Sequence, residues 1–165
     1  MARLVAREKQ EAGEQEAGAQ ELRSVVNLLG GAQILRHKLN SPLDTHEMLL
    51  RGLPEKALSH LVGSLTVIKW ASLEKAVGMS LRTYQRRKEA PDRPLSQEQS
   101  ERTWKFAEIL AKASAIIGSQ EDAEHWMKSP AIGLNQQRPI DLLATRAGAE
   151  MVENFLKQLE YGVYV

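Results

Sequence analysis

The segment from Ser96 to Gly118 constrains the fold of this chain more than any other. Ser96-Gln97-Glu98-Gln99 is a capping box, in which the serine and the second glutamine satisfy free backbone amides at the start of a helix. Apolar residues then recur at helical spacing as far as Gly118, a residue typical of helix ends. These apolar residues are Phe106, Ile109, Leu110, Ala113, Ile116 and Ile117. A long amphipathic helix is therefore predicted here.

Start signals of the same kind recur on both sides of this helix. Serine, threonine and aspartate supply cap oxygens, and proline is favoured at the first helical position. They predict helices that begin at Ser41-Pro42-Leu43-Asp44, near Pro54, at Ser119 with Asp122, at Pro139 and near Thr145. No alternating strand pattern of comparable length occurs, so we predict a mainly α fold.

The chain is expected to divide into a tail and two helical domains. Residues 1–22 are rich in Glu, Gln, Ala and Gly, and they cannot bury enough surface to offset the entropy of ordering. We predict a disordered or loosely helical tail there. Pro91 and Pro94 flank a short linker, so the two domains are predicted to span residues 23–92 and 95–165.

Composition argues against several classes of site. The 165 residues contain no cysteine, which excludes disulfides, thiol nucleophiles and cysteine-bound metals. His37, His46, His60 and His125 lack a second histidine at helical spacing, so no metal site is predicted. No nucleophile or phosphate-loop motif occurs, and we expect neither catalysis nor a cofactor. Without a signal peptide or an apolar run of about 20 residues, the chain is expected to avoid membranes and to be cytoplasmic.

Charge is unevenly distributed along the chain. Residues 1–65 carry eight basic and eight acidic side chains. Residues 66–94 carry seven basic and three acidic ones, whereas residues 95–165 carry seven basic and ten acidic ones. A basic middle and an acidic end indicate two surfaces with two kinds of partner.

The basic middle contains a helix-turn-helix pattern. A short helix with Leu73, Ala76 and Val77 on its inner face leads into the turn Gly78-Met79-Ser80. A second helix follows from Leu81 to Lys88, and we expect Leu81 and Tyr84 to face inward. Its outer face would present arginine and glutamine, which pair with base edges in the major groove of DNA. The predicted DNA-binding residues are Ser80, Arg82, Thr83, Gln85, Arg86, Arg87 and Lys88. A basic solvated surface helix is the alternative.

The last six residues, Glu160-Tyr161-Gly162-Val163-Tyr164-Val165, end the chain with aromatic and aliphatic side chains. Terminal segments rarely bury enough to stay ordered, so an apolar end calls for an explanation. Tyrosine brings a large area and a polar tip with few rotatable bonds, which suits a residue that fills a partner's cleft. The alternatives are that the two tyrosines cap their own domain or form a homodimer seam.

Many short motifs occur in an order typical of one protein family. The first half contains Leu28-Leu29-Gly30-Gly31, Ser41-Pro42-Leu43-Asp44 and Gly52-Leu53-Pro54. The second half contains Leu95-Ser96, Gln99-Ser100-Glu101-Arg102, Gly118-Ser119, Glu124-His125-Trp126-Met127, Ser129-Pro130, Pro139-Ile140-Asp141-Leu142-Leu143, Thr145 and Gly148-Ala149. The chain thus resembles the Xre/MbcA/ParS-type antitoxins of bacterial toxin–antitoxin pairs. It has Asn135-Gln136-Gln137-Arg138 where that family often has Gly-Gly.

The resemblance implies an Xre-like helix-turn-helix domain followed by a toxin-binding domain. It implies two partners, a RES-domain toxin that consumes NAD or transfers ADP-ribose from it, and operator double-stranded DNA. The antitoxin, expected to be a homodimer, would block the toxin's NAD cleft and repress its own operon. The predicted toxin-binding residues are Arg138, Glu160, Tyr161, Gly162, Val163, Tyr164 and Val165.

Two other functions fit the residues less well. The chain could be a stand-alone dimeric helix-turn-helix regulator whose C-terminal half dimerises or senses a ligand. It could also be an enzyme of unknown type, which the absence of a recognisable catalytic constellation disfavours.

Overall fold

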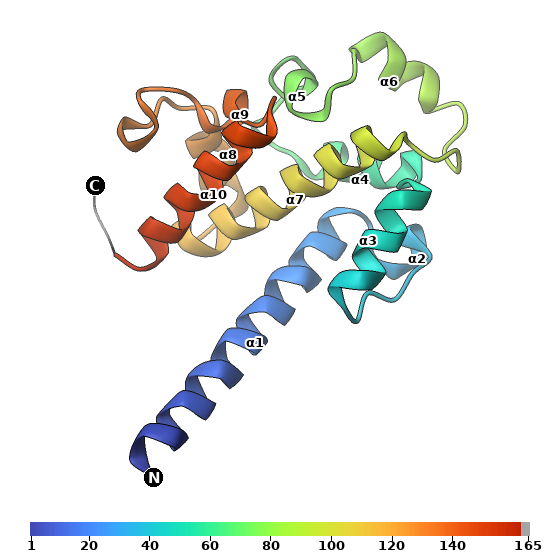
Figure 1. The fold of residues 1–165 in the computed structure, drawn as a ribbon. Helices are drawn as coiled ribbons and strands as arrows, with labels where there is room; N and C mark the ends of the chain where they lie inside the picture. The colour runs from blue at the N-terminus through green and yellow to red at the C-terminus, as the bar shows by residue number, and fades with distance from the viewer. Residues whose placement is uncertain (163–165) are drawn as a thin grey trace.

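The computed structural model describes residues 1–162, and every regular element in that range is helical (Figure 1). The only β-type pairings among these residues are the isolated bridges Pro54–Pro94 and Ala131–Gln137. The predicted mainly α fold is therefore confirmed. The elements are α1 (Ala2–Leu28), α2 (Gly31–Leu35), α3 (Pro42–Arg51), α4 (Glu55–Ser64), α5 (Trp70–Val77), α6 (Leu81–Arg87), α7 (Gln97–Ile117), α8 (Gln120–Met127), the 3-10 turn η1 (Ile132–Leu134), α9 (Pro139–Leu142) and α10 (Arg146–Glu160).

Polar side chains cap the starts of five of these helices, α3, α6, α7, α8 and α10. Ser41 accepts a hydrogen bond from the Asp44 amide at 3.2 Å, and the Asp44 carboxylate accepts one from the Ser41 amide at 2.9 Å. The capping box at the start of α7 is formed in the same way. At the start of α10, Thr145 accepts from the Gly148 amide at 3.0 Å. Each cap satisfies amides that have no partner within their own helix.

Helix α7 lies at the centre of the molecule, and α1, α3, α5, α8 and α10 all pack against it (Figure 1). Its predicted apolar stripe is buried from Phe106 to Ala113, while Ile116 and Ile117 near its end are half-buried. Buried residues from both halves of the chain form one continuous hydrophobic cluster around this helix. Packing around α7 therefore joins the two halves.

The segment before α7 is hydrogen-bonded to the helices of the first half. The Leu95 amide donates to the Leu53 carbonyl at 2.7 Å, and the Leu53 amide donates to Ser100 Oγ at 2.8 Å. Both Leu53 and Leu95 are buried. The Pro91 and Arg93 carbonyls also accept hydrogen bonds from the Lys56 and Glu55 amides, so the stretch in which we predict the domain boundary is bound to α4 along its length.

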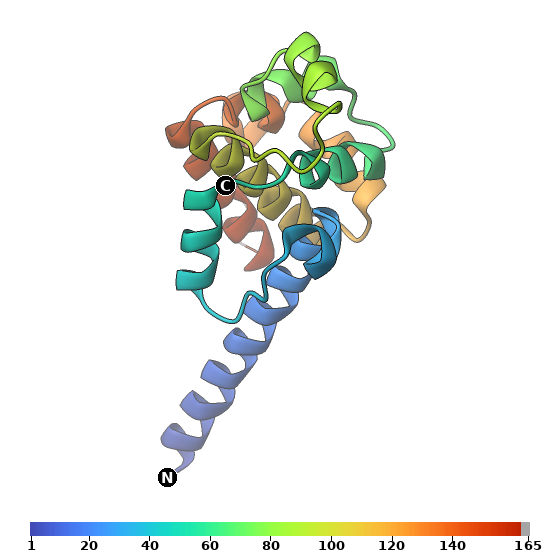
Figure 2. The ribbon, with the colours of Figure 1, turned by 90° about the vertical axis from the view of Figure 1, so that its right-hand side faces the viewer.

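Helix α1 is regular throughout, although its first 20 residues are exposed. Contact with the rest of the molecule begins near Leu22, and Val25 and Leu29 are buried. Figures 1 and 2 show the N-terminal part extending away from the helical body. Composition had predicted a disordered or loosely helical tail, and the structure gives this segment the form of a projecting helix.

The loop between α8 and α9 contains two residues with an unusual backbone. Asn135 and Gln136 have φ angles of 51° and 60°, in the left-handed region that side chains with a Cβ rarely adopt. Their backbone amides donate to the Ile132 and Ala131 carbonyls, so the strained turn is closed by hydrogen bonds.

We predict that Gln136→Gly stabilises the protein by about 0.5–1 kcal/mol, because glycine adopts a positive φ without steric strain. The side chain of Gln136 is exposed, so its removal costs no burial. Urea unfolding of the variant measures the effect. Gln137→Gly is the matched control, since Gln137 is equally exposed but has no positive φ, and it should destabilise the protein. Equal effects of both changes would contradict the strain argument.

Candidate functional site

Helices α5 and α6 form the predicted helix-turn-helix. Gly78 ends α5 with a φ of 73°, Met79 is buried in the corner, and Ser80 caps α6 by accepting from the Thr83 amide at 3.2 Å. Tyr84 is buried, as expected from its place on the inner face. Leu81 was predicted to face inward, which is wrong, because its side chain is 45% exposed. It lies in the first turn of α6.

An aromatic stack attaches α6 to the body. The ring of Tyr84 lies 4.2 Å from that of Trp70 in α5, with the two planes 10° apart. Lys88 Nζ lies 5.1 Å from the centre of the Tyr84 ring, a cation–π contact. The Tyr84 hydroxyl lies 3.3 Å from Ser59 Oγ in α4. These contacts fix the orientation of α6, which otherwise projects from the molecule (Figure 1).

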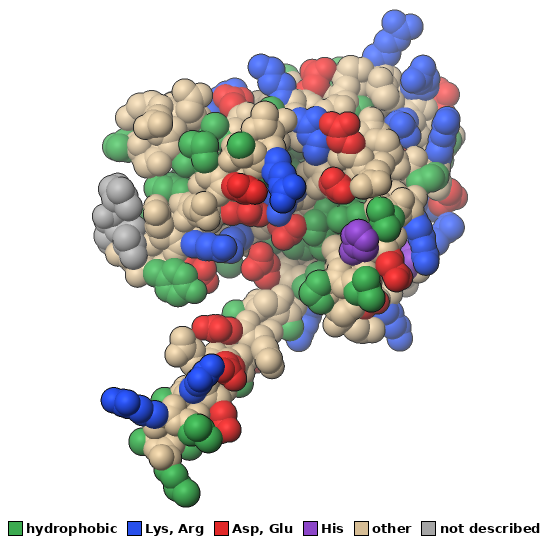
Figure 3. All heavy atoms as spheres, viewed as in Figure 1, with side chains coloured by type: hydrophobic (Ala, Val, Ile, Leu, Met, Phe, Trp, Pro, Cys, Tyr) green, Lys and Arg blue, Asp and Glu red, His purple; other side chains and the backbone are tan. Residues whose placement is uncertain are grey.

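The outer face of α6 carries most of the side chains predicted to bind DNA. Arg82, Gln85, Arg86 and Lys88 are exposed, and Figure 3 shows basic side chains gathered over this edge of the molecule. Thr83 and Arg87 are half-buried. Arg87 Nη1 donates to the Pro94 carbonyl at 3.4 Å, and the Ser80 hydroxyl donates to Thr83 Oγ1 at 3.0 Å. Thr83 and Arg87 therefore already have hydrogen-bond partners within the molecule.

A buried carboxylate from α8 holds the segment that leads into α5. Glu124 accepts hydrogen bonds from the backbone amides of residues 66–68, at 3.1, 2.7 and 2.8 Å to its Oε2. Gln120 Nε2 donates to Glu124 Oε1 at 2.9 Å and also to the Ser64 carbonyl at 2.8 Å. The sequence analysis placed Glu124 in a family motif but did not reveal this role, because the partners of Glu124 are distant along the chain.

Burial of the Glu124 side chain favours its neutral form, and hydrogen bonds oppose that effect. The donors are Gln120 and the backbone amides of Ile68, Val67 and Thr66. Their combined effect outweighs desolvation and places the pKa of Glu124 below its usual value of 4.5. The carboxylate is therefore ionised in the folded protein and stabilises it in that form.

A guanidinium group from α7 holds the other end of α5. Arg102 Nη2 donates to the Lys75 and Ala144 carbonyls, both at 2.7 Å, and Nε donates to the Ala76 carbonyl at 3.1 Å. A positive charge at a helix C-terminus is favourable, because the free carbonyls there are partly negative. A Cβ on Gly78 would come within 2.2 Å of Arg102 Nη1, so the turn of the helix-turn-helix leaves room for this side chain.

The C-terminal residues of the described chain leave apolar side chains exposed. Tyr161 is 77% exposed and does not cap the core of its own domain. Glu160 and Gly162 are exposed as well, whereas Val163, Tyr164 and Val165 lie outside the described residues. Arg138 is paired with Asp141 through two bonds of 2.7 and 2.9 Å, so its charge is balanced within the molecule. Among these predicted toxin-binding residues, Tyr161 is exposed to solvent, whereas Arg138 is engaged in an intramolecular ion pair.

The structure reveals a further exposed side chain that the sequence analysis missed. Ile132, in η1, is 82% exposed on the loop before α9. The loop rests on α10 through Gly133, which lies against the ring of Phe155, and Phe155 is stacked on Trp126 with ring centres 6.2 Å apart. Because the contact between Gly133 and Phe155 holds the loop on α10, the side chain of Ile132 points outward. An isoleucine between an alanine and a glycine gives no sequence signal that separates exposure from burial.

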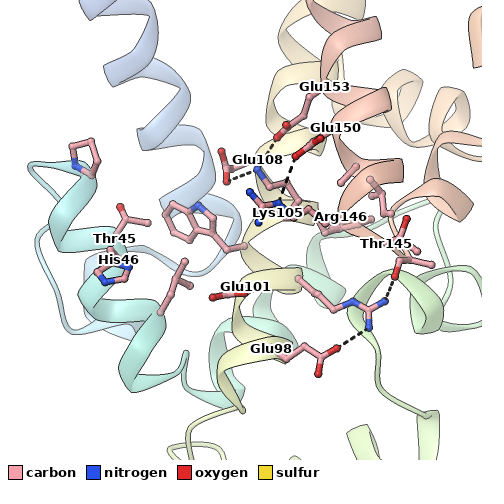
Figure 4. Close-up of a pocket in the computed structure, with 18 residues that line it drawn as sticks. Thr45, His46, Glu98, Glu101, Lys105, Glu108, Thr145, Arg146, Glu150 and Glu153 are labelled. Atoms are coloured by element: carbon pink, nitrogen blue, oxygen red, sulfur yellow. Dashed lines mark hydrogen bonds and ion pairs between the residues drawn. The ribbon is translucent and has the colours of Figure 1, made fainter.

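A groove of about 710 Å³ lies between α3, α7 and α10 (Figure 4). Lys105 Nζ in its wall lies 2.6 Å from Glu153 and 3.5 Å from Glu108. Burial raises the pKa of Glu108, and Glu153 adds to this although Lys105 opposes it. The pKa of Lys105 is also raised, because its two carboxylate partners outweigh its burial. Lys105 thus shares its charge between a carboxylate of its own helix, α7, and one of α10, and it joins the two helices in the wall of the groove.

The helices and the polar side chains of residues 1–162 were compared with the requirements of a membrane span and of a metal site. No helix among them is both long and apolar enough to cross a membrane. No group of three or more metal-ligating side chains occurs in residues 1–162 either.

Two family models match adjoining parts of the chain. The antitoxin Xre-like helix-turn-helix domain matches residues 44–108, and the antitoxin Xre/MbcA/ParS C-terminal toxin-binding domain matches residues 112–162. The first match contains α5 and α6, and the second contains Ile132 and Tyr161. The matches meet inside α7, the helix that both halves share.

Curated relatives carry antitoxin names. An Antitoxin Xre of Pseudomonas putida is 34% identical over 82 residues, which cover 50% of this chain and 51% of that protein. An Antitoxin Xre of Yersinia enterocolitica is 34% identical over 101 residues, which cover 58% of this chain and 68% of that protein. The Prs ADP-ribosylating antitoxin of a Sphingobium species is 25% identical over 133 residues, with coverages of 75% and 82%. The matched region thus spans about half of the P. putida relative.

The fold and both matches define a helical protein that combines a DNA-binding helix-turn-helix domain with a toxin-binding domain. More particularly, the chain belongs to the Xre antitoxin family. The resemblance indicated by its sequence motifs is confirmed. Neither matched domain is of an enzymatic family.

We predict that Glu124→Gln destabilises the protein by about 2 kcal/mol at pH 7, because bonds to a charged acceptor are replaced by weaker ones. The lowered pKa of Glu124 adds a pH dependence. Its stabilisation is full above the usual pKa of 4.5, which applies to the unfolded chain, and is lost as the pH falls through the lower folded value. The difference between wild type and variant should therefore shrink on acidification below about pH 4.

Urea unfolding of both proteins across this pH range measures the effect. Glu121→Gln is the matched control, because it makes the same change at an exposed position of α8 and should leave stability nearly unchanged. A difference between wild type and Glu124→Gln that is constant with pH would contradict the role of the ionised carboxylate.

Proposed function

We propose that this protein neutralises a RES-type toxin by blocking its NAD cleft and represses its own operon by binding operator DNA. The observation that carries the first part is the exposed Tyr161 at the end of the toxin-binding domain. An aromatic side chain free of its own core can bury its area in a partner. The name of the Sphingobium relative, which links an antitoxin with ADP-ribosylation, agrees with a toxin that uses NAD.

The proposed toxin contact divides into a plug and a docking surface. The plug is the tail from Tyr161 to Val165. Glu160 and Arg138 would pair with charged groups of the toxin that bind the dinucleotide. The docking surface includes Ile132, whose side chain is exposed on a loop fixed by Phe155. Large apolar side chains at the centre of an interface provide most of its binding energy.

The proposed DNA contact is the outer face of α6. Arg82, Gln85 and Arg86 would read bases, because they are exposed and carry the donors that guanine and adenine match. Lys88 and Arg87 would contact phosphates. One short helix buries too little surface for tight specific binding, so we propose a dimer that binds two half-sites.

Removing residues 161–165 should leave toxin association detectable and restore much of the toxin's NAD consumption. In the point variant Tyr161→Ala, toxin affinity should fall about 5- to 30-fold, the equivalent of about 1–2 kcal/mol. Leu43→Ala is the control, since Leu43 is comparably exposed at 62% but lies on α3, and it should neutralise normally. Circular dichroism and melting establish that each variant is folded. A folded truncated protein that neutralises fully would show that the tail is not the plug.

Arg86→Ala should cost about 1–3 kcal/mol of operator binding and relax base choice. Lys88→Ala should weaken binding to all duplexes alike and reduce the salt slope by about one. Arg146→Ala removes an exposed arginine on α10 and serves as the control, with operator binding unchanged. Fluorescence anisotropy with promoter fragments measures these effects at several salt concentrations. If both α6 variants bind like wild type, α6 does not recognise DNA.

A further inference from the structure

The N-terminal part of α1 is a helix without intramolecular packing. Residues 1–20 are exposed, and Figures 1 and 2 show them projecting well beyond the body. Its end carries Met1, Leu4 and Val5, with exposures of 110%, 67% and 49%. A single helix of about this length is only marginally stable in water without packing on one face. The segment is therefore suited to pairing with another helix.

Charge is segregated along this projecting helix. Its first ten residues contain three basic side chains, Arg3, Arg7 and Lys9, and one acidic side chain. Residues 11–21 contain four glutamates and no basic side chain. Arg7 is paired with Glu11 at 3.1 Å, which leaves Lys9 and Glu16 without an ion pair among the described residues. A helix that is basic at one end and acidic further along is complementary in charge to a second copy of itself that runs antiparallel.

One face of α1 stays free along the whole projecting part. Val5, Ala12 and Ala19 recur every seven residues and are all exposed. Val25, which is buried against the body, lies 20 residues after Val5 and thus about 200° around the helix. The face with Val5 is therefore turned away from the body, and a second helix can lie along it without meeting α7. Alanines on this face allow close approach of the two backbones.

We propose that two copies of the protein associate through antiparallel packing of their α1 helices, with Ala12 of each copy at the centre. Val5 of one copy then lies opposite Ala19 of the other, and Lys9 lies one residue, about 1.5 Å along the helix axis, from the position opposite Glu16, within reach of an ion pair. Parallel packing would place Lys9 against Lys9 and Glu16 against Glu16, which is repulsive. This inference rests on the proposed dimer and names the surface that forms it; neutralisation of a toxin does not depend on it.

The absence of cysteine in the sequence permits a direct test of this geometry. Val5→Cys and Ala19→Cys are introduced into separate full-length proteins, which are mixed and oxidised. Antiparallel packing brings these two positions within reach of a disulfide, while two copies of position 5 lie about 20 Å apart along the helix. The mixture should therefore form a disulfide-linked dimer, and each variant alone should stay largely uncrosslinked. Rapid crosslinking of the single variants would overturn the antiparallel arrangement.

Sedimentation equilibrium of the full chain and of a chain lacking residues 1–20 tests the surface itself. The deleted residues are exposed, so the core remains intact. The full chain should be dimeric and the shortened chain monomeric. Lys9→Glu and Glu16→Lys should each weaken dimerisation at least several-fold, and their combination should restore it. A shortened chain that dimerises like the full chain would overturn the inference while leaving the proposed dimer intact; a monomeric full chain would overturn both.

Discussion

The buried Glu124 carboxylate is the interaction on which the arrangement of the two halves depends. It accepts hydrogen bonds from three consecutive backbone amides in the connection between α4 and α5. A carboxylate is one of few groups that can accept several bonds at once, and its charge strengthens each of them. Arg102 has the matching role at the other end of α5, where it binds the Lys75 and Ala76 carbonyls, and it also binds the Ala144 carbonyl ahead of α10. Helix α5 is thus held at both ends by side chains from the second half of the chain.

This arrangement explains how a short α6 can be presented so far from the core. Its orientation depends on the Trp70–Tyr84 stack, and Trp70 belongs to the helix held by Glu124 and Arg102. Side chains of α7 and α8 therefore fix the position of α5, and the aromatic stack on α5 fixes the orientation of α6. A surface that reads DNA needs such support, because base contacts depend on fixed side-chain geometry.

Local features of this fold were predictable, and long-range ones were not. The caps at Ser41, Ser96 and Ser119 and the stripe of α7 depend on neighbours within a few residues, so the sequence predicts them well. Leu81 shows the limit of periodicity, which cannot tell how far a packing partner extends. Glu124 and Arg102 both lie in motifs that carry the family resemblance. They bind backbone atoms of segments distant in sequence, however, so their local sequence does not reveal these contacts. For α1, composition reported correctly that little apolar surface is buried, but did not distinguish a projecting helix from disorder.

The residues assigned to DNA and toxin binding were selected from chemistry and resemblance, and the structure adds their exposure. Exposure separates Arg86 and Tyr161, which are free, from Arg87 and Arg138, which are engaged within the molecule. Ile132 was out of reach of sequence reasoning, because a loop isoleucine is as compatible with burial as with exposure.

The sharing of α7 by both halves bears on how such proteins can diversify. The two family matches end on either side of residues 109–111, in the middle of this helix. A recombination event there would join one half of α7 to a foreign continuation whose faces must fit α1, α3, α5, α8 and α10 together. Successful exchange of a toxin-binding half between lineages therefore requires inheritance of the matching Glu124 and Arg102 contacts. The shared core constrains exposed side chains such as Ile132 in η1 and Tyr161 much less, so these positions can change without disturbing the packing around α7.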